Sequence, residues 1–259
     1  FADPRFDEKE YEPGIQQIKA LLPNLATNPD FLFQEAMNKT IYGNNPRVVN
    51  INEEVLAKAN LATIEKVYRE LFKDAAGATL TIVGNVNPAE IKPMVEKYIG
   101  SLPKGKKADV INKDNVISFA KGEVKEDVKL VMQTPKSTVL QVYSANIPYT
   151  VKTMVALEAA NYILDMIYTK TIREDEGGTY GVSTVAEISG EPKEEFAIMI
   201  IFDTDEAKAP KLIELAKQGL KDIAQNGPNV EYVTKARENM IKAFPERQIH
   251  NSYWHNVAY

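Results

Sequence analysis

The sequence predicts an α+β fold in which an antiparallel sheet is covered by helices on one side. From residue 128 onward, alternating apolar segments are interrupted by helical ones in the order ββα-ββ-αα. Thr150 opens the longest helical pattern, with apolar residues at i, i+3 and i+4 up to about Arg173. The segment Glu195–Phe202 is apolar on both faces, which is typical of a buried central strand.

The first hundred residues are predicted to be mostly helical. A lone strand, Ala78–Val83, lies among them, and Val116–Val124 is a candidate for one more. A lone strand cannot satisfy its backbone groups, so we expect its sheet partners to be missing from this sequence or to come from elsewhere. The helices are expected at 7–22, from Pro29, at 60–72 and at 88–98.

The second block is predicted to hold a complete set of sheet strands. Val128–Gln133 and Thr138–Ile147 are expected to pair through a turn at Pro135. A further strand is expected over Tyr180–Ile188, before the central strand. Two helices follow, at about 206–225, ending at Gly227-Pro228, and from Asn229, where Pro245 is expected to kink or break the helix.

Composition excludes several classes of function. The 259 residues carry 31 Lys+Arg and 36 Asp+Glu, a net charge of −5, so nucleic acid and membrane surfaces are poor partners. No apolar run approaches the roughly 18–20 residues of a membrane-spanning helix. The absence of cysteine excludes disulfides and thiolate sites. Both ends of the sequence are typical of the interior of a longer protein.

Most catalytic constellations are also missing from the sequence. His250 and His255 are the two histidines, and five residues on a helix turn their imidazoles about 140° apart, so a shared zinc ion is disfavoured. A Ser or Thr nucleophile lacks a separately placed histidine base. The single glycine of Val83-Gly84-Asn85 indicates a tight turn, not a phosphate-binding loop. We therefore predict no metal site in this chain.

One segment, residues 170–182, has the composition of a binding site. A helix is expected to end at Gly177-Gly178, leaving Arg173 in its last turn and Tyr180 near the next strand. A guanidinium and a phenol beside a turn without side chains suit peptide carbonyls and a developing oxyanion. The alternative is that Arg173 complements the helix dipole while Tyr180 packs in the core with a hydrated hydroxyl.

The same segment resembles the Arg-Tyr motif of the pitrilysin/insulinase family of zinc metallopeptidases. Arg173 and Tyr180 have the separation of that motif, around Gly177-Gly178-Thr179. Upstream, 60–72, then 80–88, then 98–103 are similar to the end of a family domain. The resemblance covers nearly the whole chain and implies the C-terminal half, without zinc, of a two-half clamshell.

That resemblance implies specific roles and partners. Tyr180 would donate to the oxyanion, while Arg173, with Gly177 and Gly178, would bind the peptide substrate. Zinc and its glutamate base would belong to the N-terminal half, in the same polypeptide or a partner subunit, so this chain alone would be inactive. The compartment would be periplasmic, with the cytoplasm as the alternative. The domains would be 1–103, the end of a third pitrilysin-type domain; 104–127, a linker; and 128–259, a truncated fourth domain.

Two other functions remain open. The chain could be a non-enzymatic interaction or assembly protein with this fold, or an inactive subunit that pairs with a zinc-bearing partner. The Arg173/Tyr180 pair favours the peptidase interpretation, because a scaffold has no need of it.

Overall fold

The computed structural model describes residues 3–106, 115–132 and 134–258. The chain divides into two compact units, one of residues 1–128 with 250–259 and one of residues 129–249. Residues 107–114, within the predicted linker 104–127, lie outside the described residues. The assignment of two pitrilysin-type domains to 1–103 and 128–259 stays a prediction.

The first unit is helical, as predicted. Four of its helices begin directly after an asparagine whose side-chain oxygen accepts a backbone N–H of the first turn: Asn28, Asn52, Asn60 and Asn87. This cap satisfies a donor that the helix itself cannot pair. The helices are α1 Glu8–Leu25, α2 Pro29–Ile41, α3 Glu53–Lys58, α4 Leu61–Leu71, α5 Pro88–Tyr98 and α9 Asn251–Ala258.

The structure contradicts both strand predictions made for this unit. Residues 78–83 and 116–124, all of them described, form no strand. Leu80 and Ile82 are 51% and 43% exposed in an irregular segment. A strand exists through its hydrogen-bonded neighbour, and the described part of the first unit offers none. The local β pattern therefore has no sheet to join.

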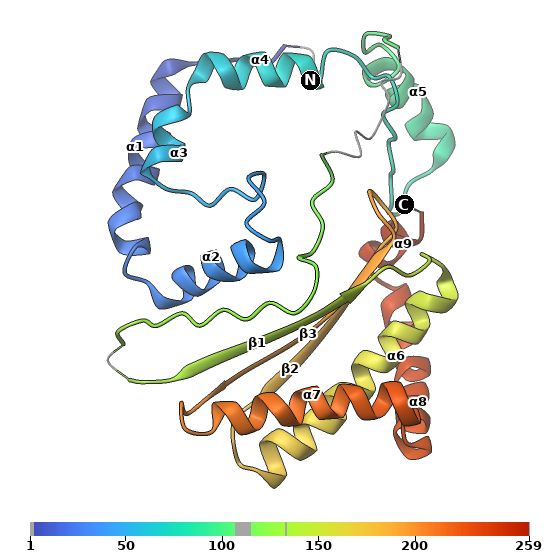
Figure 1. Cartoon of the computed structure of the whole chain (residues 1–259). Helices are drawn as coiled ribbons and strands as arrows, with labels where there is room; N and C mark the ends of the chain where they lie inside the picture. Colours follow the sequence, from blue (N-terminus) through green and yellow to red (C-terminus); the bar gives the residue numbers. More distant parts are fainter. Residues whose placement is uncertain (1–2, 107–114, 133, 259) are drawn as a thin grey trace. The chain divides into compact units, whose positions relative to one another are not determined.

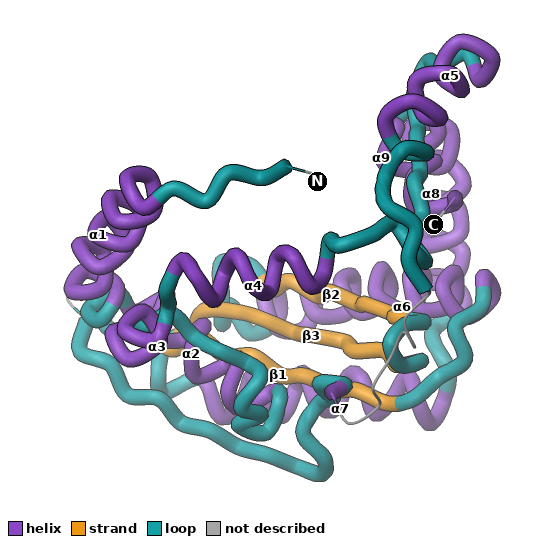
Figure 2. Tube along the Cα trace, turned by 90° about the horizontal axis from the view of Figure 1, so that it is seen from above, coloured by secondary structure: helices purple, strands orange, loops and turns teal. Residues whose placement is uncertain are grey.

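The second unit is built on a three-stranded antiparallel sheet of order β1-β3-β2 (Figure 2). β3, Glu195–Thr204, is the central strand, as predicted, and its Ile200 lies opposite Gln141 of β1 and Thr184 of β2. An interior position buries both faces of a strand, which explains its continuous apolar run. The outer strands are β1 Ser137–Ala145 and β2 Val182–Ser189.

The predicted hairpin of Val128–Gln133 with the next strand is wrong. Residues 128–132 form no strand, and Gln133 lies outside the described residues. The second member of the expected pair, β1, forms and pairs with β3 along its whole length instead. Pairing with β3 brings Val139 and Tyr143 of β1 against the core, so β1 pairs with a strand that is distant in the sequence and not with the adjacent segment.

Helices cover one face of this sheet, which confirms the predicted fold class (Figure 1). Thr150 caps α6, Val151–Tyr168, with a reciprocal capping box. The remaining helices are α7 Ala209–Asn226, which ends at Gly227 as predicted, and α8 Val230–Gln248, which continues three residues beyond Pro245. The core between helices and sheet contains Leu164, Tyr168, Ile172, Ile198, Ile200, Phe202 and Leu212.

The helices α6 and α7 approach each other closely at Gly219. A Cβ placed there would lie 2.8 Å from the ring of Tyr168, so this contact requires glycine. The Tyr168 hydroxyl donates to the Ala216 carbonyl at 2.8 Å, and burial raises the pKa of this phenol. α7 is thereby fixed against α6. Within the described residues, no helix has both the length and the apolarity needed to cross a membrane.

Candidate functional site

The site predicted at residues 170–182 is centred on a double-glycine turn in the second unit. The helical segment ends at Asp175, and Gly177 adopts a left-handed conformation with φ of 52°. The Gly178 N–H donates to the Ile172 carbonyl at 3.1 Å, which closes the helix end. The expectation that the helix ends at these glycines is confirmed, because glycine reaches this φ without a steric cost.

Three side chains from β3 and the start of α7 hold this turn in place. The Thr204 hydroxyl donates to the Gly178 carbonyl at 2.5 Å, and Lys208 Nζ donates to the Gly177 carbonyl at 3.1 Å. Lys211 forms an ion pair with Glu176. These partners lie 26 to 35 residues away in the chain. Sequence reasoning missed them, since no local pattern links them to the glycines.

The turn also rests directly on the core of the second unit. A Cβ placed on Gly178 would lie 2.6 Å and 2.8 Å from the two methyl carbons of Leu212, which is fully buried. Real Cβ atoms do not approach so closely, so the backbone of Gly178 lies where a larger residue would clash. At Gly177 an added Cβ would meet no described atom within 4 Å. Gly177 thus provides the left-handed backbone conformation of the turn, and Gly178 allows the turn to pack closely on Leu212.

We expect Thr204→Val to destabilise the chain by about 1–3 kcal/mol, because the valine leaves the buried Gly178 carbonyl without its donor. Thr204 is 7% exposed, so water cannot replace the hydroxyl. Urea unfolding followed by circular dichroism measures the change. Thr204→Ser, which keeps the hydroxyl, is the control and should lose less than half as much. Equal losses in both variants would contradict the role of this bond.

The helical segment before the turn is a π-helix, η2, Thr169–Asp175. Its i→i+5 geometry places Lys170 beside Asp175, and Lys170 Nζ lies 2.9 Å and 3.0 Å from the two carboxylate oxygens. The hydrogen bond and charge of Asp175 raise the pKa of Lys170. Sequence reasoning predicted an α-helix here. π-helical turns recur at functional sites, so the π-helix is a second reason to consider residues 169–182 as a candidate site.

Tyr180 lies in the bend between the glycines and β2, two residues before the strand. Its side chain is fully exposed, at 101% of the reference area. The Thr179 hydroxyl donates to the Gly181 carbonyl at 2.8 Å and accepts the Gly181 N–H at 3.2 Å, bracing the backbone on both sides of the tyrosine. The alternative expectation, that Tyr180 packs in the core, is wrong.

Arg173 is also exposed, in the last turn of η2, and its neighbour Ile172 is buried in the core. Neither Arg173 nor Tyr180 makes a side-chain hydrogen bond or ion pair with any residue in the described part of the chain. One brings five N–H donors and the other a phenolic O–H, all available to a ligand. A guanidinium and a phenol are groups of the kind that bind carbonyl oxygens and stabilise a negative oxygen.

Metal-binding groups do not gather in the part of the chain that the structure describes. No three His, Cys, Asp or Glu side chains there could share an ion. His250 lies between α8 and α9, and His255 lies within α9. The donor set of the described residues therefore does not fit a zinc ion.

The sequence matches a known family over most of its length. Residues 58–240 match the family model described as the peptidase M16 inactive domain, and this range holds the sheet and the Arg173/Tyr180 segment of the second unit. The chain belongs to this family. The resemblance to the C-terminal half of a zinc metallopeptidase is thereby confirmed.

Related M16 sequences are named as zinc proteases. This chain is 25% identical over 238 residues to the Probable zinc protease PqqL of Escherichia coli K12, covering 90% of this chain and 24% of that protein. It is 24% identical over 264 residues to a zinc protease PQQL-like protein of Arabidopsis thaliana, covering 95% and 27%. The M16 chain thus spans about a quarter of the length of these relatives.

Solved structures show the same fold. The periplasmic protease PqqL from Escherichia coli superposes with a TM-score of 0.79 at 21% identity, covering 96% of this chain and 27% of that one. The ferredoxin protease FusC, solved as a point mutant in complex with Arabidopsis ferredoxin, gives 0.73 at 17% identity, covering 95% and 26%. A protease from Helicobacter pylori gives 0.72 at 15%, covering 98% and 62%.

Proposed function

We propose that this chain is the substrate-binding half, without zinc, of a zinc-dependent endopeptidase. The family match and the relatives named as zinc proteases support the class of enzyme. The proposal includes the end of a third pitrilysin-type domain at 1–103, a linker at 104–127 and a fourth domain at 128–259. Because PqqL is called periplasmic, we also propose that compartment for the parent enzyme.

The observation that carries this proposal is the full exposure of Tyr180 beside a fixed turn. A tyrosine ring exposed to water gives up the burial that usually stabilises an aromatic side chain, so its position needs another reason. In the proposal, its hydroxyl donates a hydrogen bond to the scissile carbonyl oxygen as negative charge develops there. That bond is stronger in the transition state than with the bound peptide, so it speeds the reaction.

Arg173 and the glycines bind the substrate in this proposal. The guanidinium of Arg173 binds a neighbouring carbonyl of an extended peptide. Gly177, which is exposed and lacks a side chain, lets the peptide backbone come close to the turn, and Gly178, packed on Leu212, holds the turn in place for this contact. The carbonyls of both glycines already accept hydrogen bonds from Lys208 and Thr204, so the turn holds its shape. A fixed turn positions the substrate without an ordering cost at each binding event.

The zinc ion of the parent enzyme would belong to the other half. Since the donor set described above does not fit the ion, its ligands and the general base would come from the N-terminal half, in the same polypeptide or in a partner subunit. Peptides or proteins would be the substrates; the FusC structure, which holds ferredoxin, supports a protein substrate. Arg173 and Tyr180 would act on the substrate's carbonyl groups from the opposite side of the bound chain.

We expect Arg173→Gln in the parent enzyme to raise KM for a peptide about tenfold or more while kcat changes much less, because it removes binding shared by ground and transition states. Steady-state kinetics with a quenched fluorescent peptide measures both constants. Arg237→Gln, at an exposed arginine on α8, is the matched control and should leave them unchanged. An unchanged KM in the Arg173 variant would refute the binding role.

A further inference from the structure

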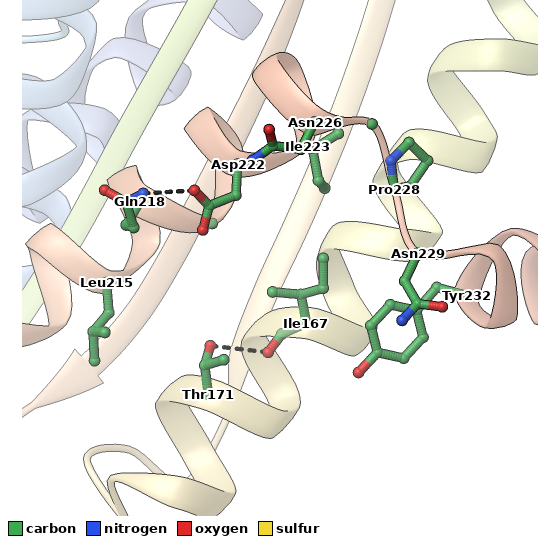
Figure 3. Close-up of a pocket in the computed structure, with 12 residues that line it drawn as sticks. Ile167, Thr171, Leu215, Gln218, Asp222, Ile223, Asn226, Pro228, Asn229 and Tyr232 are labelled. Carbon is green, nitrogen blue, oxygen red and sulfur yellow. Dashed lines mark hydrogen bonds between the residues drawn. The ribbon is translucent and has the colours of Figure 1, made fainter.

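A second site lies between α6, η2, α7 and the turn into α8. It is a groove of about 280 Å³ (Figure 3). Half-buried apolar side chains form its floor: Ile167, Leu215 and Ile223. Gly219, which the close approach of α6 and α7 requires, also lines the groove and exposes its backbone there without a side chain. The volume and the apolar floor suit one long side chain, not a whole cofactor.

The rim of the groove is negative. Asp222 lies there, exposed, one turn before α7 ends at Asn226, and it accepts a hydrogen bond from Gln218 at 2.6 Å. The last carbonyls of a helix carry partial negative charge, which a basic residue in the last turn often complements. α7, whose residues are all described, has no basic residue in its last turn. The helix end therefore lacks its usual cation, and Asp222 adds a full negative charge.

Lysines flank the groove, but no lysine or arginine is among the described residues that line it; Lys221, which precedes Asp222 on α7, lies outside the lining. Lys170 Nζ lies 2.9 Å from Asp175, and Lys235 Nζ lies 2.7 Å from Glu231. Lys235 also lies 5.9 Å from the centroid of the Tyr232 ring, on the α8 side of the groove. Both of these lysines are paired with carboxylates, and among the described residues that line the groove Asp222 alone carries a charge.

We infer that this groove binds the side chain of an arginine or lysine presented by a partner polypeptide. The aliphatic stem lies on Ile167, Leu215 and Ile223, and the cationic head reaches Asp222 and the last carbonyls of α7. Such side chains combine an apolar stem with a charged end, which matches an apolar floor with a negative rim. Arg173 and Tyr180 do not line the groove, so this inference is independent of the proposed peptidase role.

The test uses the whole 259-residue chain, labelled with ¹⁵N, and the tripeptide Ac-Gly-Arg-Gly-NH2. Backbone amide shifts of Gly219 and Gly227 are followed during titration. One side chain should bind with a dissociation constant on the order of 1–10 mM. The citrulline peptide keeps the shape of arginine without its charge and should bind about fivefold more weakly, as should the arginine peptide to Asp222→Asn. Glu214→Gln, an exposed acid on α7 outside the groove, should bind like the unaltered chain.

Several results would overturn the inference. Shifts that do not saturate at these glycines, or equal binding of the arginine and citrulline peptides, would show that the groove does not select a cation. Equal binding of Ac-Gly-Glu-Gly-NH2, in which glutamate replaces the arginine, would show the same. An equal loss of affinity for the arginine peptide in Asp222→Asn and Glu214→Gln would show that the net charge of the protein, and not the groove, attracts the peptide. Shifts that follow protein concentration without peptide would place a second copy of the chain in the groove.

Discussion

Replacing Tyr180 with phenylalanine is expected to lower kcat of the parent peptidase roughly 10²–10³-fold while KM stays within about twofold. The change removes one oxygen and nothing else from a side chain that is fully exposed and has no hydrogen-bond partner among the described residues. A hydrogen bond to a developing oxyanion is made in the transition state, so its loss falls on kcat. Quenched-peptide kinetics at saturating substrate measure the effect.

The variant separates chemistry from folding because Tyr180 adds nothing to the core. Its thermal midpoint should equal that of the unaltered protein, since an exposed hydroxyl contributes little to stability. Tyr98→Phe is the matched control: Tyr98 is 62% exposed on α5, and the same loss of a hydroxyl there should leave kcat unchanged. Equal kcat values for Tyr180→Phe and the unaltered enzyme would remove the oxyanion role and with it the main support for the proposed function.

The parts of the fold that could be predicted are those set by local chemistry. Helix starts at Asn28, Asn60, Asn87 and Thr150 follow from side chains that cap nearby N–H groups. The helix stop at Gly177 follows from the left-handed conformation that glycine adopts there. These signals lie within a few residues of the feature they set, so one sequence is enough to read them.

Strand pairing could not be predicted in the same way. The hairpin expected at residue 128 placed β1 beside its neighbour in sequence, whereas β1 pairs with β3, about sixty residues away. The segment 78–83 has strand-like residues but no partner in the described part of its unit. A strand is stabilised by a second segment, so local residues show a capacity to pair and leave the partner unspecified.

In the candidate site too, the features set by nearby residues could be predicted and those set by distant residues could not. Residue types and spacing identified Arg173, Gly177, Gly178 and Tyr180, and the resemblance to a family gave them roles. The partners that fix the turn, Thr204 and Lys208, come from β3 and from the residue that precedes α7, so the sequence could not reveal them. The π-helix was missed because residues 169–175 contain one apolar residue, Ile172, so this segment has no apolar period that could distinguish a π-helix from an α-helix.

The second large effect is expected in the core beneath the turn. Leu212→Ala should destabilise the chain by about 2–5 kcal/mol, because Leu212 is fully buried and its removal leaves a cavity under Gly178. Gly178→Ala alone should cost about 1–3 kcal/mol, since its new methyl group would overlap the Leu212 methyl carbons. Urea unfolding of the 259-residue chain measures both free energies.

The double variant decides whether this contact is what requires glycine. In Gly178→Ala/Leu212→Ala the added methyl group occupies space that the leucine has vacated, so the combined loss should fall short of the sum by about 1 kcal/mol or more. Gly177→Ala is the matched control: its φ of 52° costs about 1 kcal/mol for a residue with a Cβ, but its side chain would point into open space. Its effect should therefore add to that of Leu212→Ala without coupling. Additivity in both pairs would mean that backbone conformation alone, and not packing against α7, places the turn that carries Tyr180.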